Sequence, residues 1–514
     1  MLAPLRAGRN VCRLLQIVIT LARYDALFPV ERLSGAMLVV RLLRPFRRRD
    51  AALAKLRPGE RLAAALQALG PSFIKLGQAL SIRADLIGEE VAVDLSTLQD
   101  RLPPFPAQEA RRIIAEELDH PLEKLFSSFD DKPVAAASIA QVHFAVTTEG
   151  EDVAVKVLRP GIAASFARDL DLFFWLAGII ETTQPSLRRL KPRAIVETLA
   201  DSVRLEMDLR FEAAAASELA ENFEGDPEFR VPLVDWTRTG GHVLTLQRVH
   251  GTPIRDREAL IAQGLNIEEI LARAARAFFN QVFRDGFFHA DLHPGNLFVD
   301  AEGAIVVVDF GIMGRVDKRT RYYLADMLLG FLTGDYRRVA EVHFNAGYVP
   351  ARQSIDAFTQ ACRSIGEPIL GRAMHEISIG RLLAQLFQIT EQFEMETQPQ
   401  LLLLQKTMVL AEGVGRILDP TINMWALATP LIEDWMRINR GPEARILETL
   451  NDAFAAAQRL PALLNDLEKA AAMAADGGLR LHPESLAALK GKNGAALPLW
   501  IAALALAALA FALW

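Results

Sequence analysis

Two short polar motifs near the middle of the chain constrain its fold more than any other feature. The first, H-A-D-L-H-P-G-N, runs from His289 to Asn296, and the second, D-F-G, begins at Asp309. Between them, L-F-V and the apolar run Ala304 to Val308 flank a turn-forming stretch, a pattern that predicts a β-hairpin. Such a hairpin brings Asp309 back beside Asn296, so that side chains from both motifs reach one site.

The spacing of these polar groups is the layout that protein kinases use at their nucleotide–metal site. In that layout one Asp lies near the acceptor, while an Asn and the Asp of D-F-G hold Mg²⁺. Asp291 occupies the first position in this chain, and Asn296 and Asp309 occupy the metal-binding positions. Each motif alone is common by chance, but the two in order around a hairpin favour a kinase-like catalytic centre.

A strand-forming segment upstream carries a lysine that suits the same chemistry. V-A-V-K ends at Lys156 and is close to the V-A-I-K strand of kinases, in which the lysine bridges the α- and β-phosphates. A glutamate on a following helix orients that lysine in kinases. We expect Glu206 to do so here, with Glu212 as the second choice. A surface lysine at a strand end is the alternative interpretation of Lys156 taken alone.

The stretch just before this strand departs from the kinase pattern. Kinases have a glycine-rich loop there, whereas this chain has alanines, whose methyl groups disfavour positive φ and keep the backbone away from phosphates. We therefore expect the loop to hold a nucleotide differently from a typical kinase. The predicted cofactor-binding positions are Ala135, Ala136, Ala137, Ser138, Ile139, Ala140, Gln141, Val142 and Lys156.

The segment that follows D-F-G is short. Asp317 is a candidate N-cap for a helix beginning at Lys318, so few residues separate Gly311 from helical sequence. No A-P-E motif follows nearby. A protein kinase needs a long activation segment as a platform for its peptide substrate. The short segment argues against a peptide acceptor.

The order of elements predicts an α+β, protein-kinase-like bilobal fold with helical additions. Strands are expected at Gln141–Thr147, Asp152–Leu158, Val231–Trp236 and Val243–Val249. The predicted regions are a basic helical segment (1–60), a helical extension (61–130), a strand-rich lobe with inserted helices (131–250), a helical lobe (251–440), a helical linker (441–494) and a transmembrane anchor (495–514).

The predicted anchor, 495–514, contains no charged residue and is almost wholly apolar. A helix of about 20 residues spans the hydrocarbon core of a bilayer. Lys490 and Lys492 precede it, which favours a cytoplasmic location for the preceding domain. A buried C-terminal helix is the alternative. The net charge of −6 gives no sign of a nucleic-acid partner.

Together these motifs resemble those of the UbiB family, the atypical kinase-like proteins of ubiquinone biosynthesis that are also called the ADCK family. The added signature is F-I-K-L-G-Q, which contains Lys75 and Gln78 and resembles the family's K-x-G-Q motif. The alanine-rich loop, V-A-V-K, Glu206-x-Asp208 and the two central motifs follow in the family's order. The resemblance covers residues 10–430.

The resemblance implies an ATP-binding kinase-like fold in which the K-x-G-Q helices fold over the pocket that a peptide would occupy. Lys75 is then expected to be an inhibitory or ATPase-tuning residue. The implied cofactors are ATP and Mg²⁺. The implied partners are membrane lipids or polyprenylated quinone precursors and other ubiquinone-biosynthesis enzymes. The implied location is the bacterial inner membrane, with the catalytic domain facing the cytoplasm.

The function implied is a membrane-anchored kinase or ATPase that supports ubiquinone biosynthesis, with the phosphoryl acceptor left open. Lys156 would hold the α- and β-phosphates, and Asp291 would position the nucleophile. His289 and His293 are expected to brace the loop rather than bind metal. The alternatives are a nucleotide-switched lipid-binding scaffold and a quinone-ring hydroxylase, although neither a flavin fingerprint nor a 2-His-1-carboxylate set supports the latter.

Overall fold

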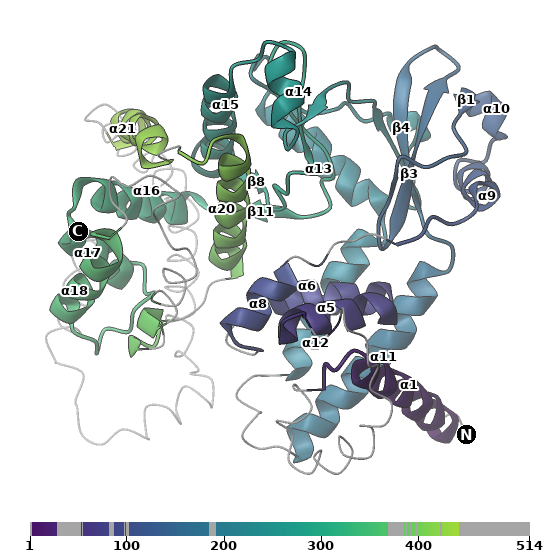
Figure 1. The fold of residues 1–514 in the computed structure, drawn as a ribbon, viewed down its shortest axis with the longest axis horizontal. Helices are drawn as coiled ribbons and strands as arrows, with labels where there is room; N and C mark the ends of the chain where they lie inside the picture. Colours follow the sequence, from purple (N-terminus) through teal and green to yellow (C-terminus); the bar gives the residue numbers. More distant parts are fainter. Residues whose placement is uncertain are drawn as a thin grey trace, which may run out of the picture. The chain divides into compact units, whose positions relative to one another are not determined.

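The computed structural model of the chain describes residues 3–27, 53, 55–81, 87–96, 98, 102–183, 192–368, 385, 388–390, 392–395, 399–421 and 424–440. The chain divides into one compact unit, Met1–Trp435, and a second unit, Met436–Trp514. In the second unit the described residues are the last turn of helix α21 (Met424–Arg440). The lobes and the candidate site lie in the first unit (Figure 1).

A five-stranded antiparallel sheet forms the smaller lobe. Its strands are β1 (Phe126–Phe129), β2 (Ala135–Ala136), β3 (Ala140–Thr147), β4 (Asp152–Leu158) and β6 (Val243–Gln247). The order is β1-β3-β4-β6, with β2 paired to β3. Three of the four predicted strands are therefore confirmed. Because β1 belongs to the sheet, the sheet begins before residue 131, where we expected the lobe to start.

The strand predicted at Val231–Trp236 is wrong. An isolated bridge joins Val234 to Leu246, and a 3-10 helix, η3 (Trp236–Arg238), follows directly. The carboxylate of Asp235 caps η3 by accepting hydrogen bonds from two backbone N–H groups, which competes with strand pairing. Pro232 also lacks the N–H that a sheet ladder needs.

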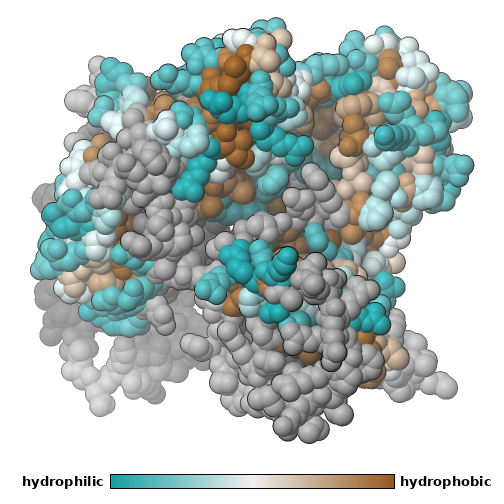
Figure 2. All heavy atoms as spheres, in the orientation of Figure 1, coloured by the Kyte–Doolittle hydropathy of each residue, from teal (hydrophilic) through white to brown (hydrophobic). Residues whose placement is uncertain are grey.

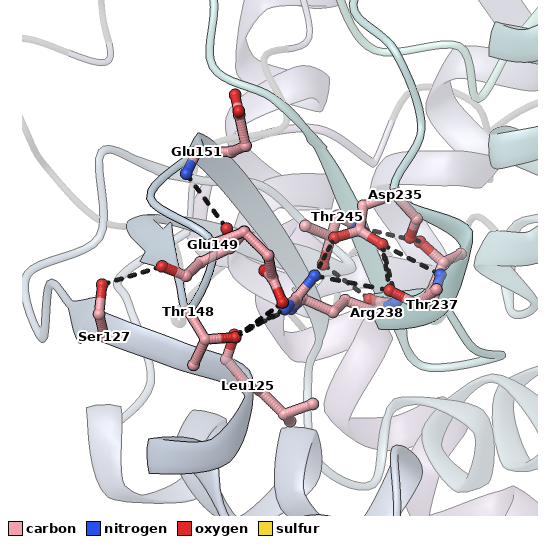
Figure 3. A network of polar contacts seen from close by, with 11 residues as sticks. Leu125, Ser127, Thr148, Glu149, Glu151, Asp235, Thr237, Arg238 and Thr245 are labelled. Atoms are coloured by element: carbon pink, nitrogen blue, oxygen red, sulfur yellow. Dashed lines mark hydrogen bonds and ion pairs between the residues drawn. The ribbon is translucent and has the colours of Figure 1, made fainter.

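A polar network fastens η3 to the hairpin end of β3 and β4 (Figure 3). The Arg238 guanidinium lies 2.7 Å from the Asp235 carboxylate and donates to the carbonyl of Leu125 at 2.8 Å. It also pairs with Glu149 in the turn between the strands. Desolvation opposes the charge of Arg238, but these carboxylates outweigh it and raise the pKa of the guanidinium. Three separate segments are thereby held together at one edge of the lobe.

The two faces of β3 and β4 have different roles, because side chains alternate along a strand. Val153, Val155 and Val157 point to one face and pack with Ile114 of helix α9 (Ala107–Glu117), which Figure 1 shows beside the strands. Lys156 points to the opposite face. The sequence therefore places an aliphatic core on one face of the sheet and the ammonium of Lys156 on the other.

The helices around the K-x-G-Q motif pack on one another and share one buried cluster with residues at the end of this sheet. They are α1 (Ala3–Arg23), α5 (Pro58–Leu69), α6 (Pro71–Ser81), α8 (Glu89–Ser96), α11 (Ile162–Thr183) and α12 (Pro192–Glu206). Phe73 and Ile74 of α6 share a buried cluster with Ile139, Ala140 and Leu158. Helix α6, which carries Lys75, therefore belongs to the same core as the strand ends that flank the alanine-rich loop.

The larger lobe is mainly helical, with two small sheets. Helix α13 (Leu209–Asn222) contacts β6 of the small sheet and also packs into the core of the larger lobe, whose first helices are α14 (Arg257–Ala262) and α15 (Ile267–Phe279). The next are α16 (Lys318–Thr333), α17 (Tyr336–Asn345), α18 (Ile355–Gly366) and α20 (Pro399–Leu418). One sheet has the order β5 (Phe229–Arg230), β10 (Ile305–Val307), β9 (Leu297–Val299) and β7 (Thr252–Pro253). The other pairs β8 (Phe287–His289) with β11 (Met313–Arg315).

The predicted hairpin and the predicted helix after D-F-G are both confirmed. β9 and β10 are antiparallel, with Val299 opposite Ile305. Helix α16 begins at Lys318, and Asp317 caps it by accepting a hydrogen bond from Thr320 N. Local turn and capping chemistry were therefore sufficient to predict these boundaries.

Within the described ranges, no helix combines the length and the apolar character that a membrane crossing requires. The predicted linker, 441–494, and the predicted anchor, 495–514, lie outside those ranges. Figure 2 shows one face of the molecule, on which hydrophilic areas are interrupted by apolar ones. Single exposed apolar side chains are normal on a folded protein and need no special role.

Gly314 on β11 allows the backbone to pass close to the buried ring of Phe288, and a Cβ at this position would overlap that ring. We expect Gly314→Ala to lower the free energy of unfolding by about 1–3 kcal/mol, the usual cost of overpacking a core. Gly178→Ala on α11 is the matched control, because a Cβ there meets nothing within 4 Å. Thermal unfolding of both variants tests this, and an unchanged midpoint for Gly314→Ala would contradict it.

Candidate functional site

Lys156 on β4 lies at the centre of an ion cluster in which Lys156 and Glu212 are largely buried and the Asp309 carboxylate is about half exposed. Its Nζ is 2.7 Å from Glu212 Oε1, 2.9 Å from Glu212 Oε2 and 2.9 Å from Asp309 Oδ1. The strand, helix α13 and the D-F-G segment therefore meet at one ammonium. A lone lysine on a strand surface is excluded, because burial without these carboxylates would be costly.

The expected partner of Lys156 was Glu206, and this first choice is wrong. Glu206 Oε2 lies 2.8 Å from Nζ of Lys75, and both side chains are at most 9% exposed. Glu206 is the last residue of α12, and Asp208 then caps α13, so a helix break separates Glu206 from Glu212. Glu212, the second choice, lies one turn inside α13 and reaches Lys156.

The charges in the cluster shift one another's ionisation. Burial raises the pKa of Glu212 to about 7, because the attraction of Lys156 only partly offsets desolvation and the repulsion of Asp309. The Lys156 ammonium lowers the pKa of Asp309 well below its usual range, with a smaller contribution from Lys75. Desolvation opposes the charge of Lys156, but Asp309 and Glu212 outweigh it and raise its pKa. Lys156 and Asp309 are thus both ionised at neutral pH.

His289 joins the catalytic loop to D-F-G. Its Nδ1 accepts a hydrogen bond from Asp291 N at 3.2 Å, so its proton is on Nε2, which donates to the carbonyl of Asp309 at 2.8 Å. Burial lowers the pKa of His289 and keeps the ring neutral. His293 Nδ1 accepts from Gly295 N at 3.1 Å. The prediction that both histidines brace the loop is confirmed by these bonds.

Asn296 and Asp291 face each other across the loop. Asn296 Nδ2 donates to the Asp291 carbonyl at 3.0 Å and lies 3.3 Å from Asp291 Oδ2. Val308 N donates to the carbonyl of Asn296 at 3.0 Å, which holds the loop against the residue before Asp309. The hairpin thus brings Asn296 next to D-F-G, as the sequence predicts.

The side chains of the catalytic loop and of D-F-G carry oxygen atoms of the kind that a hard divalent cation prefers. The carboxylates of Asp309 and Asp291 and the amide oxygen of Asn296 are the donor types that Mg²⁺ prefers. Asp309 adopts φ +66°, a left-handed conformation that is strained for a residue other than glycine. Such strain is typical of functional positions, and here it directs the carboxylate toward Lys156.

The alanine-rich loop is held as a tight turn between β2 and β3. Ala137 N donates to the Ala140 carbonyl at 2.8 Å, and the Arg159 guanidinium donates to the Ala137 carbonyl at 2.9 Å. Val142 is directly opposite Lys156 in the β3–β4 ladder and shares its face.

Gln141 lies on the other face of this ladder. Its amide bonds to the backbone of Phe105, at 3.0 Å through Oε1 and 3.3 Å through Nε2. The side chain of Gln141 therefore holds the proline-rich segment around Phe105 in place. Only the backbone of Gln141 is available to the alanine-rich loop.

Two site residues were missed by sequence reasoning. Gln281 is buried on η4, a π-helix (Asn280–Asp285), and its Oε1 accepts a hydrogen bond from His289 N at 2.8 Å. Lys406 on α20 places Nζ 3.4 Å from Asp291 Oδ1. The apolar run before Lys406 indicates a buried helix, but no local pattern links that helix to the loop.

A strand lysine paired with a helical glutamate, beside a loop Asp and Asn and a D-F-G Asp, defines a protein-kinase-like domain. Residues 97–343 match the family described as the ABC1 atypical kinase-like domain, and residues 362–423 match the UbiB helical domain. The chain belongs to the UbiB family of atypical kinase-like proteins. The family resemblance is therefore confirmed.

Curated relatives agree over most of their length. A probable protein kinase UbiB of Marinobacter nauticus is 43% identical, covering 85% of this chain and 81% of that protein. The protein of the same description from Pseudomonas entomophila is 42% identical, covering 87% of this chain and 84% of its own. A solved complex of Rv3197 with erythromycin from Mycobacterium tuberculosis is 26% identical and covers 78% of this chain and 98% of its own, with a TM-score of 0.49.

The raised pKa of Glu212 predicts a specific pH dependence of stability. Between its ordinary value of 4.5 and about 7, the folded chain binds a proton that the unfolded chain releases. The contribution of Glu212 to the free energy of unfolding therefore falls as pH rises through this window. Asp309 titrates below the window and Lys156 above it.

We expect the wild type to lose thermal stability relative to Glu212→Gln between about pH 5 and about pH 8. The measurement is the difference between the two unfolding midpoints, taken in one detergent at several pH values. A difference that moves in favour of the wild type as pH rises would show that Glu212 has a lowered pKa instead.

Proposed function

We propose that this chain binds Mg·ATP and transfers or hydrolyses its γ-phosphate as an atypical kinase or ATPase of ubiquinone biosynthesis. The contact of Lys156 with both Glu212 and Asp309 is the observation that supports this most directly. Membership of the UbiB family supports the link to ubiquinone.

In this proposal each polar group has a distinct task. Lys156 binds the α- and β-phosphates while keeping its contact with Glu212, and it releases Asp309 Oδ1 to do so. Asn296 and Asp309 hold Mg²⁺, which when bound neutralises phosphate charge. Asp291 orients the attacking hydroxyl or water and accepts its proton. The alanine-rich loop, 135–142, closes over the nucleotide with its backbone.

Lys75 is proposed to tune this reaction from the K-x-G-Q helix. Its ion pair with Glu206 fixes α6 against the end of α12, two residues before the cap of α13. Because α13 carries Glu212, a shift of α6 would be transmitted to the partner of Lys156. This arrangement supports a regulatory role for Lys75 and a positioning role for Glu206, rather than direct contact of Glu206 with the nucleotide lysine.

Asp309→Asn should remove the reaction while leaving the fold intact. We expect ATP turnover by the purified full chain to fall by at least about 10²-fold, because a charged ligand of the metal becomes neutral. The readouts are calorimetry with Mg·ATP and phosphate release in vesicles containing anionic lipid. Glu302→Gln, in the exposed turn of the hairpin, is the control. Equal turnover by wild type and Asp309→Asn would refute the proposed chemistry.

The same variants test the pathway. In a strain that lacks its own ubiquinone-biosynthesis homologue, the wild type and Glu302→Gln should restore quinone content and Asp309→Asn should not. A nucleotide-switched scaffold is favoured instead if Asp309→Asn restores quinone as well as the wild type does.

The membrane anchor is proposed from the apolar run at 495–514 and its preceding lysines. We expect deletion of 495–514 to move the protein from the membrane pellet to the soluble fraction of bacterial lysates. A deletion of equal length within the linker, 441–494, is the control. Membrane association that persists without 495–514 would assign the attachment to another surface.

A further inference from the structure

The carboxylate of Asp291 is contacted from two sides. Asn296 Nδ2, from the same loop, lies 3.3 Å from Oδ2. Lys406 Nζ lies 3.4 Å from Oδ1 and comes from α20, 115 positions later in the sequence. The second contact links the candidate catalytic loop to the helical segment that follows the kinase-like domain.

Helix α20 is fixed firmly enough to place this lysine. Leu404 packs in a buried cluster with Phe288 and Ala290, the residues that flank His289. Thr407 is fully buried and donates its hydroxyl to the Leu403 carbonyl at 2.9 Å. The backbone on both sides of Lys406 is therefore part of the core beneath the catalytic loop. The Lys406 side chain extends from there to the rim, where it is 24% exposed.

The loop itself contains no lysine or arginine next to Asp291. Residues 292–295 are Leu, His, Pro and Gly. Lys156 contacts Glu212 and Asp309, and Lys75 contacts Glu206. Among the described residues, Lys406 is the cationic side chain that lies within ion-pair distance of Asp291.

Stability does not account for this contact. A partly exposed ion pair with this separation contributes about 0–1 kcal/mol to folding. The same contact affects the reaction rate even though it adds little to stability. A fixed charge stabilises charge that develops in the transition state without having to reorganise. An ammonium held at one oxygen of Asp291 restrains the rotation of the carboxylate and leaves Oδ2 toward Asn296 and the metal-binding side.

We propose that Lys406 is a positioning residue for Asp291 and so makes α20 part of the machinery for phosphoryl transfer. This inference rests on the proposed function and deepens the role of Asp291 in it. In the reaction, the acceptor oxygen bonds to the γ-phosphorus and the bond to the leaving ADP oxygen breaks. The acceptor proton passes to Asp291, and Lys406 keeps its own proton throughout.

The test compares Lys406→Met, which removes the charge, with Lys406→Arg, which retains it. We expect Lys406→Met to lower kcat by about 10²-fold, the loss that follows a displacement of about 1 Å in a reacting group. KM for Mg·ATP should stay within about twofold, since the groups proposed to bind nucleotide are untouched. Lys406→Arg should recover most of kcat. Gln405→Met, at the exposed neighbouring position on α20, is the control.

Each result decides between roles. The purified full chain is assayed by phosphate release from Mg·ATP in vesicles of phosphatidylcholine with phosphatidylglycerol, together with thermal unfolding. Wild-type kcat in Lys406→Met overturns the positioning role and leaves the proposed function standing. A kcat that falls in step with the unfolding midpoint, equally in the Met and Arg variants, shows a structural role and also overturns it.

If Lys406→Met does not fold, Lys406→Gln replaces it, and a kcat equal to that of Lys406→Arg overturns the inference. If the wild type neither binds nor turns over Mg·ATP, the proposed function fails, and the role of Lys406 falls with it. Calorimetry of the wild type therefore separates the two failures.

Discussion

The ion cluster of Lys156, Glu212 and Asp309 is the interaction on which the rest of the site depends. The largely buried Glu212 and the half-exposed Asp309 share the ammonium of Lys156, which would be costly to bury without a carboxylate partner. Its three members come from a strand, a helix and the D-F-G segment. The cluster is therefore complete only when the small sheet, α13 and the hairpin occupy their correct relative positions.

A second ion pair lies one helix earlier and likewise joins a buried lysine to a glutamate. Lys75 and Glu206 are both nearly buried, and Glu206 ends α12 just before α13 begins. Each buried lysine thus has its own glutamate, and the two glutamates lie on either side of the helix break at Asp208. Instead of the one expected pair, Lys156–Glu206, the structure has two pairs, Lys75–Glu206 and Lys156–Glu212. Because Glu206 and Glu212 lie on consecutive helices, the K-x-G-Q helix is connected through α12 to the partner of Lys156.

Features set by local chemistry could be predicted from the sequence, whereas features set by long-range packing could not. Strand alternation and turn residues were sufficient for β3, β4 and the hairpin, and a single cap was sufficient for α16. Spacing alone could not choose between Glu206 and Glu212, since the choice depends on where α13 starts. The contact of Lys406 with Asp291 could not be predicted for a similar reason, because only the packing of α20 brings the two side chains together.

The residues after D-F-G bear on the nature of the acceptor. Met313 to Arg315 form β11, which pairs with β8 and places Met313 opposite His289. Helix α16 begins three residues after Arg315. The segment that would serve a protein kinase as a peptide platform is thus short and is occupied in pairing with β8. This short segment favours water or a small hydroxyl compound over a peptide as the acceptor proposed for Asp291.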